Sequence, residues 1–413
     1  MHEVPDLSKL TAVLPGGALS FDGGDGYGVD GMTPSVVVKP SSQAEVAAAL
    51  GAASEAGAAV VPFGGGTQQG LGLPPERYDV ALDLRRIDGL IEHEPADLTV
   101  TVEAGMRLST LQGLLGEQGQ CLPLDPPVAD EATVGGVLAT NASGPARLAR
   151  GTARDLVIGM TVATAQGELV KSGGRVVKNV AGYDLAKLHI GALGTAGVIV
   201  QVSFKVAPLP VRETCLGVQG GLEALAGLAE AVQDARLALT GAILGKGEAE
   251  PGWMLGLRFA GGNAAVARSL RETRALAEAA GVQVEELGAT GWRALQTGYV
   301  LASVVVRASV LPSALASVSG ALASAGAAVS VLPGVGVAYG SWPGDVEPQR
   351  LRLLREVCVS KGGALVIEKA PVETKRAIDV WGEPRGDFEL MQRLKQEMDP
   401  GRVLNPGRFL GGV

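Results

Sequence analysis

The first half of the chain alternates short apolar runs with polar turns, as in a mixed α/β domain. Residues 35–39 are apolar at their centre and precede Pro40, which predicts a short strand. Ser41 then suits the N-cap of an alanine-rich helix over 43–56, which Gly57 ends. Further apolar runs bounded by Gly, Asp or Pro predict strands over 58–63, 80–84, 98–102, 156–163 and 198–206.

From about Val211 the pattern changes to repeated strand–helix–strand units. Alanine- and leucine-rich helices are predicted over 223–239, 263–280 and 312–325, and strands over 254–259, 282–287, 301–306, 329–332 and 335–339. Two such units in tandem predict a ferredoxin-like antiparallel sheet with helices on one face. A last helix over 387–395, followed by Asn405-Pro406-Gly407, predicts a tail that docks back on the body.

These elements predict an α+β chain in three parts. A first domain covers residues 1–210, a cap domain covers 211–375, and a carboxy-terminal tail over 376–413 returns to the first domain. A chain of 413 residues has room for two or three domains and for a large buried cofactor.

Composition narrows the class of protein. With 46% hydrophobic and 19% charged residues, the chain is expected to be globular. A net charge of -8 without a lysine or arginine run argues against nucleic acid as a partner. Three widely spaced cysteines without a CxxC pair suggest neither an iron–sulfur cluster nor a disulfide framework.

The start of the chain and its apolar runs bear on location. Residues 1–10 carry Glu3 and Asp6 and lack the basic and then apolar pattern of a secretory signal. No uncharged apolar run of membrane-like composition reaches the ~18 residues of a spanning helix. We therefore expect a cytoplasmic protein without direct membrane insertion, whose only contact with the inner membrane would be peripheral, through a partner.

A glycine cluster follows the strand predicted over 58–63. Within residues 62–70, the three consecutive residues Gly64, Gly65 and Gly66 allow positive φ angles that turn several N–H groups toward one point, which suits a pyrophosphate. The segment has neither the Walker lysine nor a G-x-G-x-x-G spacing. Taken alone, it is also compatible with a plain glycine turn.

Two more segments place small and polar residues between glycines. Residues 122–127 and 132–144 combine prolines, threonines and glycines that let backbone approach a flat ring and offer side-chain donors. In residues 175–199, Lys178 and Asn179 together lie between apolar neighbours, and a glycine-rich turn leads into a strand. Each segment alone could equally be a tight packing turn or a loop closure.

With all three segments in view, the chain resembles the vanillyl-alcohol oxidase (PCMH-type) FAD-binding family, and within it the FAD-binding E subunits of glycolate oxidase. The resemblance covers residues 36–210 and the ending 393–407. It implies a two-lobed FAD-binding domain, a ferredoxin-like cap and a returning tail. It also implies that residues 64–67 hold the pyrophosphate, that residues within 133–144 line the flavin, and that 197–199 lie at the adenine end. The candidate cofactor-binding residues are Pro62, Phe63, Gly64, Gly65, Gly66, Thr67, Gln68, Pro126, Thr133, Gly135, Gly136, Thr140, Asn141, Gly144, Lys178, Gly197, Val198, Ile199 and Asn405.

The histidines separate this chain from parts of that family. Some members tether the flavin through a histidine or cysteine, but neither the Gly64 segment nor residues 133–144 contain one, which predicts non-covalent FAD. Related D-lactate dehydrogenases and the paralogous D subunit use a histidine- and acid-rich cluster in the cap for metal binding and proton removal. No histidine follows Val211 here, so the catalytic residue stays open. Glu368 and Lys369 are candidate bases, with ordinary ion pairing as the alternative, and no cluster has metal-ligand spacing.

Three functions fit these observations. The first is an FAD subunit of a multi-subunit glycolate (2-hydroxy-acid) dehydrogenase, in which a paralogous FAD-binding subunit oxidises the substrate and an iron–sulfur subunit carries electrons away. The second is a self-sufficient FAD-dependent oxidoreductase of a hydroxy acid or polyol. The third is a scaffold that has lost its cofactor, against which the intact Gly64–Thr67 segment argues. The histidine-free cap favours the first.

Overall fold

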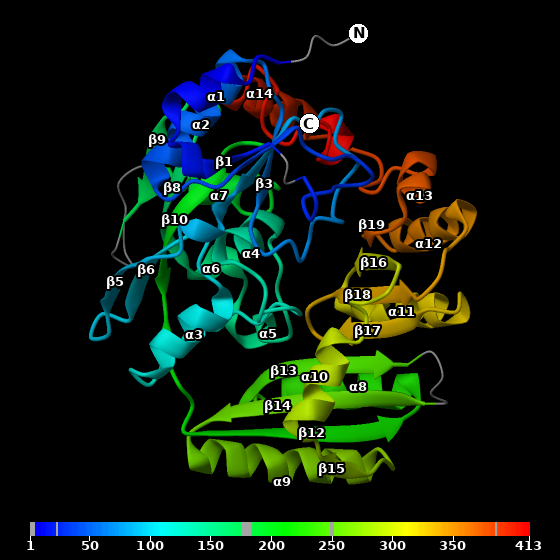
Figure 1. The fold of residues 1–413 in the computed structure, drawn as a ribbon. Coiled ribbons are helices and arrows are strands. Elements are labelled where there is room, and N and C mark those ends of the chain that lie inside the picture. The colour runs from blue at the N-terminus through cyan, green and yellow to red at the C-terminus, as the bar shows by residue number, and fades with distance from the viewer. Residues whose placement is uncertain (1–4, 22–23, 175–182, 248–251, 385) are drawn as a thin grey trace. The chain divides into compact units, whose positions relative to one another are not determined.

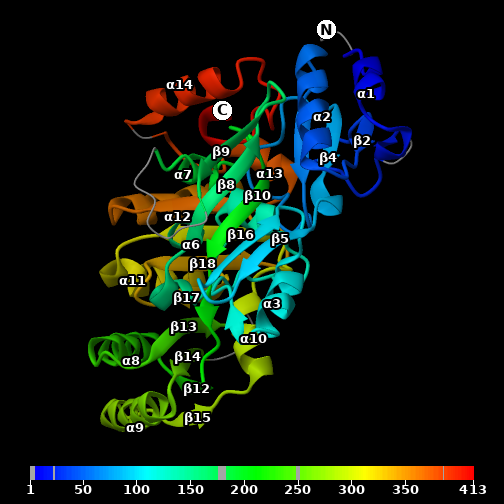
Figure 2. The same cartoon turned by 90° about the vertical axis from the view of Figure 1, so that its left-hand side faces the viewer.

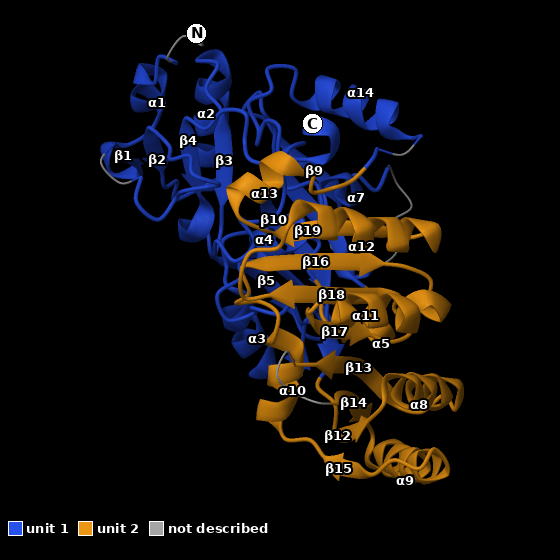
Figure 3. Ribbon diagram, turned by 90° about the vertical axis from the view of Figure 1, so that its right-hand side faces the viewer, with its two compact units in different colours: residues 1–142, 152–208, 383–413 blue, residues 143–151, 209–382 orange. Residues whose placement is uncertain are grey.

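The computed structural model describes residues 5–21, 24–174, 183–247, 252–384 and 386–413 (Figure 1). The chain forms two compact units, coloured separately in Figure 3. Unit 1 contains residues 1–142, 152–208 and 383–413, and unit 2 contains residues 143–151 and 209–382. The sequence does not predict that residues 143–151 belong to unit 2, because no change of composition marks the ends of this segment.

Unit 1 contains a small sheet in the order β1 (Leu19–Ser20), β2 (Val36–Val38), β4 (Val80–Asp83) and β3 (Val60–Phe63). Strands β2 and β3 both run parallel to β4, as a crossover through helix α2 (Gln43–Glu55) requires. The buried side of α2, which includes Val46 and Leu50, packs into the same core as the strands. The predicted strand, helix and strand are thus present in this order.

The N-cap of α2 differs by one residue from the prediction. The Ser42 hydroxyl accepts a hydrogen bond from the Glu45 amide at 3.2 Å, so Ser42 and not Ser41 is the N-cap. Ser41 instead donates its amide and hydroxyl to the Glu45 carboxylate. The two adjacent serines therefore bind different groups of Glu45, Ser41 its carboxylate and Ser42 its backbone amide.

The second layer of unit 1 is an antiparallel sheet in the order β5 (Leu90–Glu94), β6 (Thr99–Glu103), β10 (Val198–Lys205), β8 (Val157–Ala163) and β9 (Leu169–Gly173). Helices α3 (Leu108–Gly116) and α4 (Val134–Thr140) contribute Leu111, Leu115, Val137 and Leu138 to its core. The short strands β7 (Gln120–Cys121) and β11 (Ala207–Pro208) pair separately. Val198 and Val200 of β10 also belong to the core of the small sheet, so the two sheets, which give the two lobes expected for the FAD-binding domain, pack against each other.

Unit 2 is built on an antiparallel sheet that contains eight strands in the described part of the chain, ordered β15-β12-β14-β13-β17-β18-β16-β19. Its strands are β12 (Arg212–Gly220), β13 (Leu239–Lys246), β14 (Trp253–Gly261), β15 (Val284–Glu286), β16 (Val304–Ser309), β17 (Ala328–Leu332), β18 (Val337–Trp342) and β19 (Ala364–Lys369). Its longer helices are α8 (Leu222–Asp234), α9 (Asn263–Ala279), α10 (Ala289–Thr297), α11 (Leu315–Ser324) and α12 (Pro348–Ser360).

Each half of this sheet is a ferredoxin-like βαββαβ unit, and the two halves join where β13 pairs with β17. Helices α8, α9, α11 and α12 lie on one side of the sheet (Figure 2). The predicted antiparallel, ferredoxin-like sheet with helices on one face is confirmed, but each predicted strand–helix–strand unit is part of a complete βαββαβ unit, and the helix predicted over 223–239 ends at Asp234. Arg236 follows with a positive φ of 49° and redirects the chain into β13.

The end of the chain returns to unit 1. Helix α13 (Val372–Ala377) belongs to unit 2, whereas α14 (Phe388–Met398) and residues 399–413 belong to unit 1. The last helix is amphipathic, and Leu404 beyond it forms a parallel bridge with Val60 of β3. Across the described residues, no helix combines the length and apolar character needed to cross a membrane.

Candidate functional site

A cavity in unit 1 brings together four segments that are distant in sequence. The first follows β3, the second comprises the start and interior of α4, the third surrounds the start of β10, and the fourth is the tail after α14. Among the predicted residues, those that line this cavity are Pro62, Phe63, Gly64, Gly65, Gly66, Thr67, Gln68, Thr133, Gly135, Gly136, Thr140, Val198, Ile199 and Asn405.

The first two segments touch so closely that only glycine fits between them. A Cβ atom on Gly64 would overlap the Thr133 hydroxyl, and one on Gly65 would overlap the backbone oxygen of Glu131. Gly66 adopts a φ of +74°, which β-carbon-bearing residues rarely tolerate. The glycine run therefore lets its backbone lie directly against the segment that enters α4, at the wall of the cavity.

Helix α4 presents its first turns to the same cavity. The Thr133 hydroxyl caps the helix by accepting a hydrogen bond from the Gly136 amide at 3.3 Å. The Thr140 hydroxyl donates to the Gly136 carbonyl at 2.8 Å, and Asn141 ends the helix in the left-handed region at a φ of 52°. A Cβ on Gly135 would lie 2.9 Å from the Ala104 methyl group, so this helix also depends on glycine to approach its neighbours.

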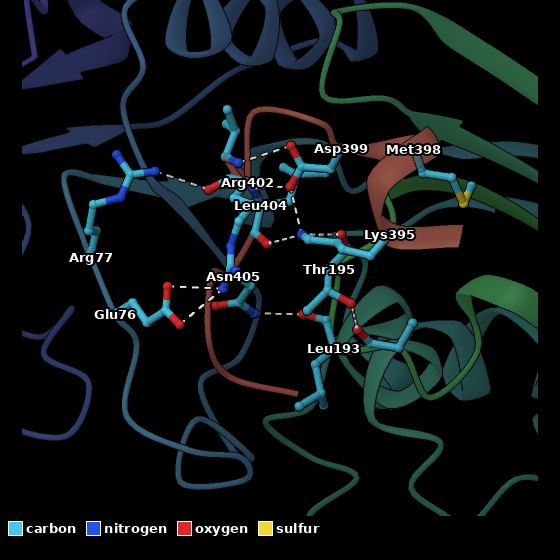
Figure 4. Close-up of polar contacts among 12 residues, drawn as sticks. Glu76, Arg77, Leu193, Thr195, Lys395, Met398, Asp399, Arg402, Leu404 and Asn405 are labelled. Atoms are coloured by element: carbon cyan, nitrogen blue, oxygen red, sulfur yellow. Dashed lines mark hydrogen bonds and ion pairs between the residues drawn. The ribbon is translucent and has the colours of Figure 1, made fainter. Parts of the chain in front are cut away.

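The tail reaches the cavity by adding itself beside β3. The Val60 amide donates to the Val403 carbonyl at 2.7 Å, and the Asn405 amide donates to the Val60 carbonyl at 2.8 Å. The Asn405 side chain then crosses to the third segment and donates to the Leu193 carbonyl at 2.6 Å (Figure 4). Asn405 thereby connects the two lobes of unit 1 at the cavity wall.

The buried ammonium group of Lys395 connects the tail to the third segment beside the Asn405 contact. Lys395 donates to the Thr195 carbonyl at 2.8 Å and to the Leu404 carbonyl at 2.9 Å (Figure 4). Its charge is balanced by the Asp399 carboxylate at 2.6 Å. Burial lowers the pKa of Lys395, while Asp399 acts against that shift by favouring the charged form.

Arg408 is the main cavity residue that the sequence did not suggest. It is 2% exposed, and its guanidinium donates to the side-chain and backbone oxygens of Gln69 and to the Leu71 carbonyl. Burial lowers the pKa of Arg408 to about 10, so it stays charged at neutral pH. The cavity lining missed from the sequence consists of Gln69, Leu71, Leu84, Ala104, Ala139, Leu193, Gly194 and Arg408. Arg408 directly follows the Asn405-Pro406-Gly407 turn, which was the available signal.

Five predicted contacts do not appear in this cavity lining. Pro126, Asn141 and Gly197 belong to unit 1 but lie outside the lining, Gly144 belongs to unit 2, and Lys178 lies outside the described residues. Gly197 has a packing role, since a Cβ there would lie 2.5 Å from a Val162 methyl group. Their contacts with a cofactor stay predictions.

The cavity fits a ligand that carries both phosphate and N–H groups. The Asn405 Oδ1 atom is buried and has no hydrogen-bond partner among the described residues, so it can accept a hydrogen bond from a bound ring. No histidine or cysteine is among the described residues that line the cavity. Over the same described ranges, no group of histidine, cysteine and acidic side chains has the arrangement of a metal site.

Comparisons with known proteins define the class. Residues 34–173 match the family model of the FAD binding domain. Over its whole length the fold resembles p-cresol methylhydroxylase, with a TM-score of 0.75 at 15% identity, covering 97% of this chain and 95% of that one. An alkyldihydroxyacetonephosphate synthase gives a TM-score of 0.74 at 16% identity, covering 99% and 87%. Residues 34–173 therefore form an FAD-binding domain, and FAD is the cofactor that this match supports.

Curated relatives are glycolate oxidase subunits and hydroxy-acid dehydrogenases. The chain is 42% identical over 130 residues to glycolate oxidase subunit GlcE of Escherichia coli K12, covering 31% of this chain and 37% of that protein. It is 31% identical over 194 residues to subunit GlcD of Bacillus subtilis 168, covering 47% and 41%. It is 34% identical over 177 residues to a D-2-hydroxyglutarate dehydrogenase of Xanthomonas citri, covering 43% and 38%. The matched stretch thus spans less than half the length of each relative.

Proposed function

We propose that this chain is the FAD-binding subunit of a multi-subunit glycolate-type dehydrogenase, which oxidises a 2-hydroxy acid such as glycolate to glyoxylate and passes electrons to an iron–sulfur subunit. The observation that carries the proposal is the cavity of unit 1, where two glycine-rich segments, the start of β10 and the tail converge within and around the matched FAD-binding domain. The names of the relatives supply the substrate class and the kind of assembly.

The residues of the cavity divide into groups with different tasks. The backbone N–H groups of residues 64–67 suit the pyrophosphate of FAD, and the buried charge of Arg408 raises the electrostatic potential around them. The free Oδ1 atom of Asn405 suits an N–H group of a ring. Bound FAD would supply the electron acceptor. Since no histidine or cysteine of the described lining can tether it, the proposal includes non-covalent binding.

The cap supports a role in which another subunit removes the substrate proton. Residues 211–413 contain no histidine. Glu368, the candidate base, forms an ion pair with Arg307 at 2.6 Å and its side chain is 15% exposed. Burial raises the pKa of nearby Tyr339 to about 12, so this phenol is not a base at neutral pH. We therefore assign substrate oxidation to a paralogous FAD-binding subunit and electron transfer to this chain.

A self-sufficient dehydrogenase is the alternative, favoured by the relatives named as D-2-hydroxyglutarate and D-lactate dehydrogenases. Visible spectra of the chain purified alone, before and after anaerobic addition of glycolate or D-lactate, separate the two. Under the proposal the protein is yellow, releases FAD on acid precipitation, and is bleached by substrate only after the partner subunits are added. Bleaching by substrate alone would establish the alternative, and a colourless protein that never takes up FAD would refute both.

A further inference from the structure

A groove on the helical side of unit 2 is lined by residues that do not line the FAD cavity. It runs between α8 on one side and the 3-10 turn over Pro312–Ala314 with α11 on the other, above the seam where β13 pairs with β17. Its volume is about 770 Å³. Helices α8 and α11 come from different ferredoxin-like halves, so the groove lies along the junction between the halves.

The floor of the groove is apolar but contains one serine hydroxyl without a hydrogen-bond partner among the described residues. Leu244, Leu315 and Val331 supply buried side chains from β13, α11 and β17. Ser319 is fully buried in the lining, and its hydroxyl has no hydrogen-bond partner among the described residues. A buried hydroxyl without a partner costs free energy, which a ligand with a donor or acceptor at this depth would offset.

One edge of the groove carries charge of a single sign. Glu223, Glu230 and Asp234 of α8 are exposed and line it, and no lysine or arginine is among the described lining residues. The described residues offer none of these three carboxylates an ion pair, in contrast to Glu272 on neighbouring α9, which pairs with Arg268 at 2.7 Å. Spacings of seven and four residues place the three on one stripe, about 10 Å and 6 Å apart along the helix axis.

We propose that this groove docks a basic amphipathic helix of a partner protein. Because α8 and α11 contact each other, such a helix would lie over the groove and cover the exposed Leu311 and the half-buried Leu222 with its apolar side. Lysine or arginine side chains along one flank would meet the three unpaired carboxylates of α8, and this charge complementarity selects a cationic partner. The small residues Ala226 and Gly227 on the groove side of α8 leave room for close approach of such a helix. The proposal does not depend on which hydroxy acid is oxidised.

The test uses the FAD-loaded full chain and a fluorescein-labelled leucine–lysine amphipathic peptide of about 18 residues, roughly the length of α8 with one extra turn. Fluorescence anisotropy measures its Kd at about 0.15 M ionic strength. The double variant Glu230→Lys/Asp234→Lys should weaken binding at least about tenfold. Gly227→Trp fills the groove without changing charge and should weaken binding similarly, since an added Cβ at Gly227 meets no atom within 4 Å.

Matched controls separate docking from simple attraction to an acidic protein. Glu278→Lys/Glu285→Lys makes the same change of charge at exposed positions of unit 2 outside the groove, and Gly113→Trp adds the same bulk at an exposed position of α3 in unit 1. Both should leave the Kd unchanged. Equal weakening by the charge control, tight binding to the Gly227→Trp variant, or equal binding of a leucine–glutamate peptide would overturn the proposal. The flavin absorbance of each sample shows separately whether the cofactor site is intact.

Discussion

The ammonium group of Lys395 lies 2.6 Å from the carboxylate of Asp399, and these side chains are only 8% and 0% exposed. Asp399 also accepts hydrogen bonds from the Val403 and Leu404 amides, while Lys395 reaches the Thr195 carbonyl. Hydrogen bonds offset the desolvation of this buried pair, because the Lys395 ammonium donates three of them and both Asp399 oxygens accept. It fixes the tail against the segment that enters β10, and both border the cavity.

Replacing Lys395 by Met should therefore affect both stability and cofactor binding. The change leaves the Asp399 carboxylate buried without its counter-ion, which costs about 3–5 kcal/mol in the free energy of unfolding. It should also weaken FAD binding, because Leu193 and Asn405 lose a nearby anchor. Urea unfolding and the FAD content after gel filtration measure the two effects.

Arg402→Gln provides a control in the same tail. Arg402 pairs with Glu76 at 3.0 Å, but both side chains are about half exposed, so its loss should cost no more than about 1 kcal/mol and leave FAD bound. If Lys395→Met and Arg402→Gln behaved alike, the buried pair would not organise the cavity.

Gly65→Asp should abolish FAD binding. The added side chain would overlap the Glu131 backbone oxygen and place a negative charge where the pyrophosphate is proposed to lie. Gly113→Asp, at an exposed position of α3, is the control because a Cβ there meets no atom within 4 Å. The ratio of flavin to protein absorbance reports the outcome, and stoichiometric FAD in Gly65→Asp would mean that the pyrophosphate lies elsewhere.

Asn405→Asp tests the cavity wall with little change of shape. Asn405 has a φ of 47°, and aspartate tolerates this region nearly as well as asparagine. The variant loses the donor to the Leu193 carbonyl and adds a negative charge, so the Kd for FAD should rise at least about tenfold. Titration of the apoprotein, followed by flavin fluorescence, measures this Kd. An unchanged value would show that the side chain is not directed at the cofactor.

His189 should make the folded state sensitive to acid. It is buried, and burial lowers its pKa from 6.5 to about 4. The unfolded chain therefore takes up a proton below pH 6.5, where the folded chain does not, so the free energy of unfolding falls as the pH drops from 6.5 to 4. The slope from this one group is about 1.4 kcal/mol per pH unit. Urea unfolding at several pH values should show a smaller slope for His189→Gln than for the native chain; equal slopes would contradict the assignment.

The sequence was sufficient for many of the elements and for the glycine-rich walls, because both depend on local pattern. The strands β3 and β4 and five strands of the eight-stranded sheet follow from apolar periodicity, and the Gly64 run was recognisable as a motif, whereas β12, β13 and β19 were not predicted. Contacts between distant segments were not predictable in this way. Nothing local shows that Gly65 lies against Glu131 or that Arg408 reaches Gln69, since these pairs form only after the chain has folded.

The burial of Lys395 was not predicted from the sequence either. Lys395 lies in an amphipathic helix where a lysine normally faces solvent, yet it is buried because Asp399 follows one turn later. The family resemblance implies that Gly197 lies at the adenine end, which stays a prediction; the structure adds a packing role, since a Cβ there would lie 2.5 Å from a Val162 methyl group. In both cases the residue type can be read from the sequence, but the residue that it contacts cannot.

Glu368→Gln tests which subunit supplies the base. Loss of a general base typically lowers a rate by about 10²–10⁴-fold, whereas Glu368 is already engaged by Arg307 at 2.6 Å. In the reconstituted assembly we expect glycolate oxidation to fall well under tenfold, with full FAD content, because the change affects only this ion pair. The measurement is the rate of flavin bleaching by glycolate under anaerobic conditions. A loss of a hundredfold or more, with FAD still bound, would instead place the base in this chain and favour the self-sufficient dehydrogenase.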